Sequence, residues 1–141
     1  MFQQSAALLL AAIALLIPST LAGEGVHLAN CGPNVNSPIA SVVAYYPDDS
    51  QSNTAPLSQN VAFATDPARV VTWEGNSYTA SFATGNTFTT HINSGSFGFG
   101  QYAGTGNNQQ RQFVCFRDNG RQLWRSTDAY ACFSIYYCLD A

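Results

Sequence analysis

The sequence contains very little charge. Only 9% of its 141 residues are charged, Lys is absent, and all five basic residues are Arg. The formal net charge is −3 at pH 7. Strong binding to nucleic acid or to anionic lipid requires several phosphates to be neutralised, so we expect neither as a partner. No N-x-[ST] sequence occurs, so N-glycosylation is not expected.

Long apolar segments are also lacking, with one exception near the N-terminus. Residues 6–17 form an uninterrupted apolar run, followed by Pro18 and by the small residues Thr20 and Ala22. A membrane-spanning helix needs about 20 apolar residues, so this run is too short for one. The pattern is typical of a secretory signal peptide cleaved after Ala22. We therefore predict a signal peptide over 1–22, a secreted, extracellular protein without a membrane span, and a single domain over 23–141.

The remaining sequence has no long segment with apolar residues at helical spacing. Short alternating segments rich in Val, Thr, Tyr and Phe are instead separated by Gly, Pro and Asn, which favours strands joined by turns. We expect strands over 25–31, 41–46, 60–65, 69–75, 77–82, 87–93, 98–102, 112–117, 122–126 and 129–138. This pattern predicts an all-β fold, either an antiparallel β-sandwich or a small barrel. Asn119 and Gly120 suit a type I′ turn, so a two-residue hairpin is expected there.

Four cysteines, Cys31, Cys115, Cys132 and Cys138, follow the signal peptide, and an even number in a secreted chain predicts two disulfides. If 129–138 is one unbroken strand, Cys132 and Cys138 lie on one face about 20 Å apart. A disulfide needs Cα atoms within roughly 7 Å, so these two are not expected to bond to each other. The predicted hairpin favours Cys115–Cys132, which leaves Cys31–Cys138 to join the terminal strands.

Residues suited to acid-base chemistry are few, and three of them suggest a hydrolase. Arg69 and Glu74 lie in "PARVVTWEG", His91 follows, and "GTGNNQQRQFVC" places a Gly-Asn segment before a cysteine. This arrangement is similar to the fungal guanyl-specific ribonucleases, which cleave RNA by general acid-base catalysis. In that family the glutamate precedes the arginine, which is not the order here. The resemblance implies a small secreted ribonuclease-like hydrolase using Glu74, Arg69 and His91, without a cofactor, as the alternative function.

A second group combines arginine with aromatic residues near the C-terminus: Arg117, Arg121, Trp124, Arg125 and Tyr130. Guanidinium groups and aromatic rings together favour a binding patch for an anionic or carbohydrate surface. The alternative is that the Arg side chains protect an exposed edge hairpin from pairing with other chains.

Asp48, Asp49 and Ser52 offer oxygen ligands within the segment "YYPDDSQSN". This segment resembles the calcium-binding loop of βγ-crystallin domains, which implies a calcium site. The alternative is a solvated Pro-Asp turn without a metal. Zinc-ligand spacing is absent from the sequence, and no metal or cofactor is favoured.

The segments "GVHLANC", "VVAYYPDDS", "VTWEG" and "CFSIYYC" resemble uncharacterised small secreted cysteine-containing proteins of fungi. The resemblance implies an effector-like, toxin-like or cell-wall-associated protein, and it assigns no catalytic residue. Together with the low charge, it favours a secreted, disulfide-stabilised, non-enzymatic binding protein. Its expected partner is an extracellular protein or a polysaccharide.

Overall fold

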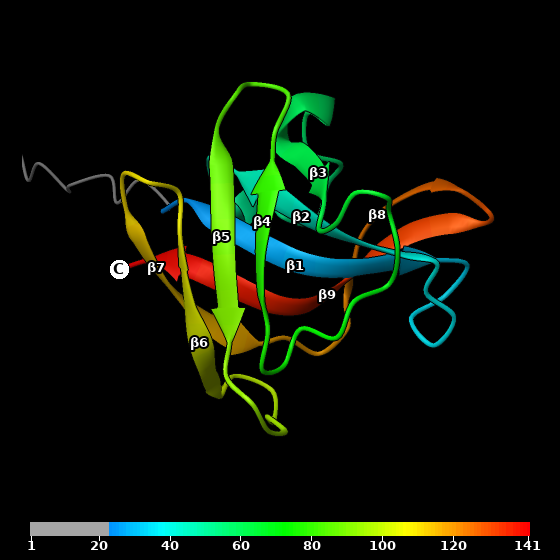
Figure 1. Cartoon of the computed structure of the whole chain (residues 1–141). Coiled ribbons are helices and arrows are strands. Elements are labelled where there is room, and N and C mark those ends of the chain that lie inside the picture. Colours follow the sequence, from blue (N-terminus) through cyan, green and yellow to red (C-terminus); the bar gives the residue numbers. More distant parts are fainter. Residues whose placement is uncertain (1–22) are drawn as a thin grey trace, which may run out of the picture.

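The computed structural model describes residues 23–141, and the predicted signal peptide lies outside the described residues. The all-β prediction is confirmed (Figure 1). The elements are β1 (Gly25–Gly32), β2 (Ala40–Tyr46), η1 (Asp49–Gln51), η2 (Ser58–Asn60), β3 (Val61–Phe63), β4 (Ser77–Ser81), β5 (Thr87–Ile92), β6 (Tyr102–Asn107), β7 (Gln112–Arg117), β8 (Gln122–Thr127) and β9 (Tyr130–Asp140), where η denotes a short 3-10 helix. Within these residues, no helix is long and apolar enough to cross a membrane.

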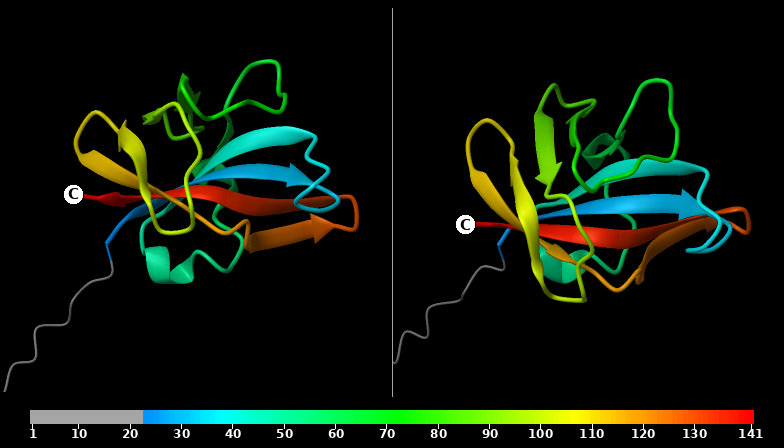
Figure 2. Two further views of the ribbon diagram at one scale, coloured as in Figure 1. Left: turned by 90° about the horizontal axis from the view of Figure 1, so that it is seen from below. Right: turned by 60° about the horizontal axis from the view of Figure 1, so that its bottom comes forward.

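The strands form one antiparallel sheet that curves into a nearly closed barrel. Its strand order is β3-β2-β1-β9-β7-β6-β5-β4, and β8 pairs with β9 outside this path. The two end strands, β3 and β4, approach each other without pairing. In Figure 1 the β4–β5 hairpin stands in front of β1 and β9, while the β8–β9 hairpin projects to the right; Figure 2 shows the same projection from two further sides.

Strand β9 organises the sheet because it pairs on both of its edges. One edge pairs with β1, whereas the other pairs with β8 over its first half and with β7 over its second half. Opposite β1, Ser134 faces Ala29 and Tyr136 faces Leu28, so Ile135 is an extra residue in β9. Such a bulge reverses which face the following side chains occupy. Cys132 and Cys138 therefore lie in different clusters, and the predicted shared face is wrong.

The disulfides are Cys31–Cys132 and Cys115–Cys138, so the two favoured pairings, Cys31–Cys138 and Cys115–Cys132, are wrong. Both observed bonds join residues directly opposite each other on neighbouring antiparallel strands, with Cα atoms 4.0 Å apart. The error arises because β1 runs antiparallel to β9, which brings Cys31 to the start of β9 and not to its end. The expectation that Cys132 and Cys138 do not bond to each other is confirmed.

The predicted hairpin at Asn119-Gly120 is also wrong. The backbone amides of Asp118 and Gly120 donate to the carbonyls of Ile135 and Ser134, so this segment follows the edge of β9 beside the bulge. Strands β7 and β8 thus form one interrupted edge along β9, and the chain reverses only at residues 128–129.

Two apolar clusters occupy opposite faces of the sheet. The barrel interior contains Val26, Leu28, Val43, Ala64, Val71, Trp73, Ala80, Phe88, Ile92, Ala103, Phe113, Tyr136 and the Cys115–Cys138 bond. The smaller cluster contains Ala29, Val42, Leu123 and the Cys31–Cys132 bond, with Trp124 and Tyr130 packed at its margin. Each disulfide is therefore buried inside one of the two clusters.

Two expected strands are absent. Residues 69–75 contain no strand. The Arg69 carbonyl accepts from the Ser41 amide, and the Val71 amide donates to the Ser41 hydroxyl. The backbone of this segment is therefore hydrogen-bonded to β2 without forming a regular β-ladder. Residues 98–101 form a loop in which Gly100 has φ of +78°. Strand β6 begins at Tyr102 and includes Gly104 and Gly106, which lie outside the strands expected from the sequence. A Cβ at Gly104 would lie 2.1 Å from the His91 carbonyl oxygen, so close packing of β5 on β6 requires glycine there.

Candidate functional site

A cleft of about 370 Å³ opens at one end of the barrel, and we call it the Glu74 cleft. It is lined by Glu74, Gly95, Ser96, Phe97, Arg117 and Tyr136. The backbone of Glu74 forms a bridge with Ile92 at the end of β5, and the Gly75 amide donates to the Ile92 carbonyl. These contacts fix Glu74 at the mouth of the barrel, next to the loop that follows β5.

A carboxylate, a guanidinium and a phenol meet in this cleft. The Tyr136 hydroxyl donates to Glu74 Oε1, and Arg117 Nη1 lies 3.7 Å from the same oxygen. The Arg117 guanidinium also lies 5.1 Å from the centre of the Tyr136 ring. Burial and the hydrogen bond to Glu74 raise the pKa of Tyr136 to about 12, so its phenol remains protonated at neutral pH. The Glu74 and Arg117 side chains are both about one-third exposed and present acceptor and donor groups together.

One aromatic ring besides Tyr136 lines the cleft, and two exposed aromatic residues follow it in the chain. Phe97 packs edge-on against Tyr136, with ring centres 6.4 Å apart. Phe99 and Tyr102 are 69% and 53% exposed. Between them, the Gly100 amide donates to the Arg117 carbonyl and the Arg117 amide donates to the Gln101 carbonyl, which ties this segment to β7. Tyr102 lies opposite Phe116 of β7, so its ring is on the other face of the sheet from Arg117. We call the combined surface of Glu74, Phe97, Phe99 and Arg117 the cleft surface.

The three residues of the predicted hydrolase do not all reach this cleft. Glu74 lines it, whereas Arg69 and His91 do not. His91 is exposed on the outer face of β5, where its Nδ1 lies 2.8 Å from the Ser77 hydroxyl. Arg69 is exposed beside β2, to which its backbone is bonded. The basic residue next to Glu74 is therefore Arg117.

The structure divides the predicted binding patch among three places. Arg117 lies in the Glu74 cleft, whereas Arg121 donates to Asp118 and Ser52 elsewhere on the barrel. Arg125 donates to the carbonyls of Thr127, Asp128 and Pro33 near the tip of the β8–β9 hairpin. Trp124 and Tyr130 pack against the smaller apolar cluster. The charged contacts of Arg117, Arg121 and Arg125 therefore go to three different parts of the chain.

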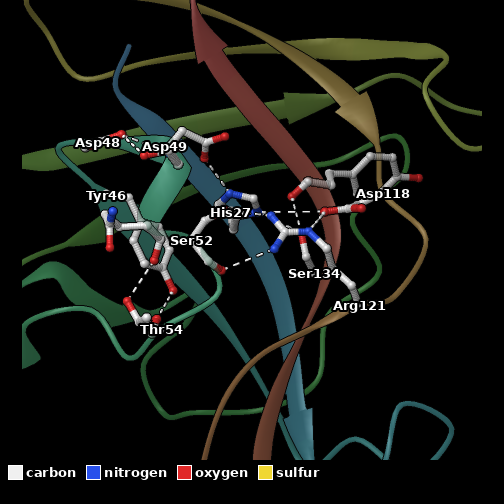
Figure 3. A network of polar contacts seen from close by, with 12 residues as sticks. His27, Tyr46, Asp48, Asp49, Ser52, Thr54, Asp118, Arg121 and Ser134 are labelled. Atoms are coloured by element: carbon white, nitrogen blue, oxygen red, sulfur yellow. Dashed lines mark hydrogen bonds and ion pairs between the residues drawn. The ribbon is translucent and has the colours of Figure 1, made fainter. Parts of the chain in front are cut away.

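Figure 3 shows a second polar group, a network centred on His27. His27 is fully buried, with Nε2 2.8 Å from Asp49 Oδ1 and Nδ1 2.8 Å from the Ser134 hydroxyl. Asp118 Oδ2 lies 3.8 Å from Nδ1 and accepts from Arg121, whose guanidinium also donates to Ser52. The network joins η1, β1, β9 and the 118–121 segment.

The Ser134–His27–Asp49 contacts have the connectivity of a catalytic triad, but their burial favours a structural role. Ser134 and His27 are both 0% exposed, so a substrate has no access to the serine hydroxyl. Ser134 also donates to the Tyr136 carbonyl beside the bulge. The network therefore fastens the 48–52 segment to the outside of the barrel.

The predicted calcium ligands take part in contacts of their own. Asp48 Oδ1 accepts from the Ser50 amide and hydroxyl, Asp49 contacts His27, and the Ser52 hydroxyl accepts from Arg121. Across residues 23–141, no group of three or more His, Cys, Asp or Glu side chains is arranged to hold a metal ion.

Sequence reasoning missed the roles of Tyr136 and His27. Tyr136 is 62 positions from Glu74 along the chain, and Ser134 is 107 positions from His27. The pairing of β1 with β9 brings His27 to Ser134, and the bridge of Glu74 with Ile92 of β5 brings Glu74 across the barrel mouth to Tyr136. The sequence carried no local signal for either contact.

Comparisons of the chain with protein-family models, with curated proteins and with solved structures find no match.

Proposed function

We propose that this chain is a secreted, disulfide-stabilised, non-enzymatic binding protein that takes an extracellular polysaccharide on the cleft surface. The observation that carries the proposal is the Glu74–Arg117 pair in a cleft lined by Phe97, with the exposed ring of Phe99 in the same loop. Sugar hydroxyls both donate and accept hydrogen bonds, and a carboxylate beside a guanidinium serves both needs. Exposed rings supply apolar area with little loss of side-chain entropy, which suits the flat faces of sugar rings.

The charge of the cleft favours a neutral polysaccharide. Its lining contains one carboxylate, Glu74, and one guanidinium, Arg117, so their charges balance. An anionic ligand that approached Arg117 would also approach the Glu74 carboxylate, which opposes its binding. Neutral chains such as chitin or a glucan avoid this repulsion.

The composition of the cleft also favours binding over catalysis. Hydrolysis of a glycosidic bond generally uses two carboxyl groups, and the residues lining the cleft include one. The acid-base chemistry of the ribonuclease-like alternative needs a histidine, and His91 lies on the outer face of β5. Of the three residues that the hydrolase alternative requires, the lining of the cleft therefore contains Glu74 but not Arg69 or His91.

The proposal is tested by sedimentation of the secreted protein with insoluble chitin and insoluble glucan. We expect Phe99→Ala and Glu74→Gln to weaken binding to one of these polymers at least about tenfold, which corresponds to about 1.4 kcal/mol. Phe63→Ala is the matched control, because Phe63 is also an exposed aromatic residue, at 52%, but lies on β3.

Two results contradict the proposal. Binding that is lost in Trp124→Ala but kept in Phe99→Ala places the site on the β8–β9 hairpin. Cleavage of RNA that disappears in both Glu74→Ala and His91→Ala supports the hydrolase.

A further inference from the structure

The first described residue, Gly23, lies where the start of β1 meets the end of β9. Its carbonyl accepts from the Asp49 amide at 3.0 Å, which holds it against η1. A Cβ at Gly23 would lie 2.5 Å from Asp140 Oδ1. The backbone of Gly23 is therefore directly beside the Asp140 carboxylate, and closer than a larger residue could come without moving it.

Carboxylates exceed cations at this corner of the barrel. Among the ion pairs of residues 23–141, Glu24 takes part in none, and Asp140 pairs with Arg111, whose Nη1 lies 3.1 Å from Oδ2. Glu24 Oε2 is buried and has no hydrogen-bond partner. Burial and the Glu24 carboxylate raise the pKa of Tyr45, so its phenol is neutral and adds no positive charge. The corner therefore has two carboxylates and one cation.

Cleavage of the predicted signal peptide after Ala22 supplies a second cation. Water adds across the peptide bond, so that Ala22 leaves with a carboxylate and Gly23 keeps an amine. An α-amine has a pKa of about 7.7–8.0 and is mostly protonated at neutral pH. Its nitrogen is bonded to the Cα of Gly23, which lies beside Asp140. The ammonium group is thereby formed next to the two carboxylates that need it.

We propose that cleavage after Ala22 completes an ion cluster in which the Gly23 α-ammonium binds Asp140 and Glu24, so that removal of the signal peptide stabilises the folded domain. The uncut chain has an uncharged amide nitrogen at this position and cannot make the contact. The inference rests on the predicted cleavage site and does not depend on the polysaccharide function proposed for the cleft surface.

The absence of Lys allows this ammonium group to be changed selectively. In a chain that starts at Gly23, the α-amine is the one primary amine, and Gly23 is exposed to reagents. Acetylation removes its positive charge, whereas reductive dimethylation keeps the charge. Mass spectrometry of the secreted protein first identifies its N-terminal residue. Urea denaturation of the unmodified, acetylated and dimethylated protein then measures the contribution of the charge to stability.

We expect acetylation to lower the equilibrium constant for folding at least about fivefold, and dimethylation to change it less than about twofold. In Asp140→Asn the effect of acetylation falls below about twofold, because the ammonium group has lost its nearest partner. Asp128→Asn is the matched control and keeps the full effect of acetylation, because Asp128 is an exposed carboxylate at the β8–β9 turn.

Four outcomes overturn the proposal. The first is a secreted protein whose N-terminal residue is not Gly23. The second is an acetylated protein as stable as the unmodified one, and the third is an equal loss after acetylation and after dimethylation. The fourth is an equal effect of acetylation in wild-type protein and in Asp140→Asn. None of these outcomes involves polysaccharide binding, so failure of either proposal is recognised separately.

Discussion

At the scale of single residues, His27 shows how a polar side chain can support an apolar barrel. It is fully buried, yet both ring nitrogens have polar neighbours, Asp49 on one side and Ser134 on the other. The sequence showed His27 in a strand and Asp49 in a loop, but not that the loop folds back over that strand. That contact depends on tertiary packing, which local patterns do not encode.

We predict that His27→Ala lowers the free energy of unfolding by about 3 kcal/mol, measured by urea denaturation. The change leaves Asp49 without its partner and the buried Asp118 with one neighbour fewer, and such groups are costly to desolvate.

His91→Ala is the matched control and is expected to change stability by less than about 0.5 kcal/mol, because His91 is exposed. If the two variants lost equal free energy of unfolding, the His27 network would not hold the 48–52 segment on the barrel.

At the scale of elements, most strands could be predicted because apolar and polar residues alternate in them. The bulge at Ile135 could not, because no Gly or Pro marks it. That one extra residue explains why the shared face inferred for Cys132 and Cys138 was wrong. The inferred pairing failed because β1 runs antiparallel to β9 and because β7 and β8 do not form a hairpin. The sequence also did not predict that β7 and β8 lie end to end along β9. Asn119-Gly120 is equally compatible with a hairpin turn, so the local sequence does not distinguish the two arrangements.

The close approach of β5 and β6 gives a prediction at this scale. Gly104→Ala is expected to destabilise the protein by at least about 2 kcal/mol, since the new Cβ would meet backbone atoms of β5, which cannot move aside as a side chain can.

Gly98→Ala is the control, because a Cβ there meets only the Gln101 side chain, at distances no shorter than 3.5 Å. Thermal and urea unfolding of the two variants measure the difference. A change of less than about 0.5 kcal/mol for Gly104→Ala would show that the two strands separate easily.

At the scale of the whole molecule, the disulfides join distant parts of the chain through its central strand. Cys31–Cys132 spans 101 positions and Cys115–Cys138 spans 23. Two disulfides could be predicted from the count of cysteines and the predicted signal peptide, but their partners required the strand order of the barrel.

Removal of each bond as a pair of serines gives the third stability prediction. Without a disulfide the unfolded chain has more conformational entropy, which lowers the free energy of unfolding. From the loop lengths, we expect a loss of about 4.7 kcal/mol for Cys31→Ser with Cys132→Ser and about 3.4 kcal/mol for Cys115→Ser with Cys138→Ser. Urea denaturation of the two double variants gives the order of these losses. A larger loss for the second pair would mean that packing around the bonds outweighs the entropy of the open chain.

The Glu74 cleft gathers residues that lie far apart in the sequence. Its charges balance between Glu74 and Arg117, and the half-buried ring of Phe97 lines it. Glu74 and Arg117 were both identified from the sequence as candidate residues, but for different functions. Their meeting in one cleft could not be predicted, because it results from the loop after β5 lying against β7.

The central claim is that the cleft surface binds a polysaccharide, and the most direct measurement is NMR mapping of backbone amides during titration with chitin and glucan oligosaccharides. We predict that one oligosaccharide shifts the amides of Gly95, Ser96, Phe99 and Arg117 in a saturable way, and that the shifts disappear in Phe99→Ala. Saturable shifts confined to the β8–β9 hairpin, or no shifts with either ligand, would contradict the account.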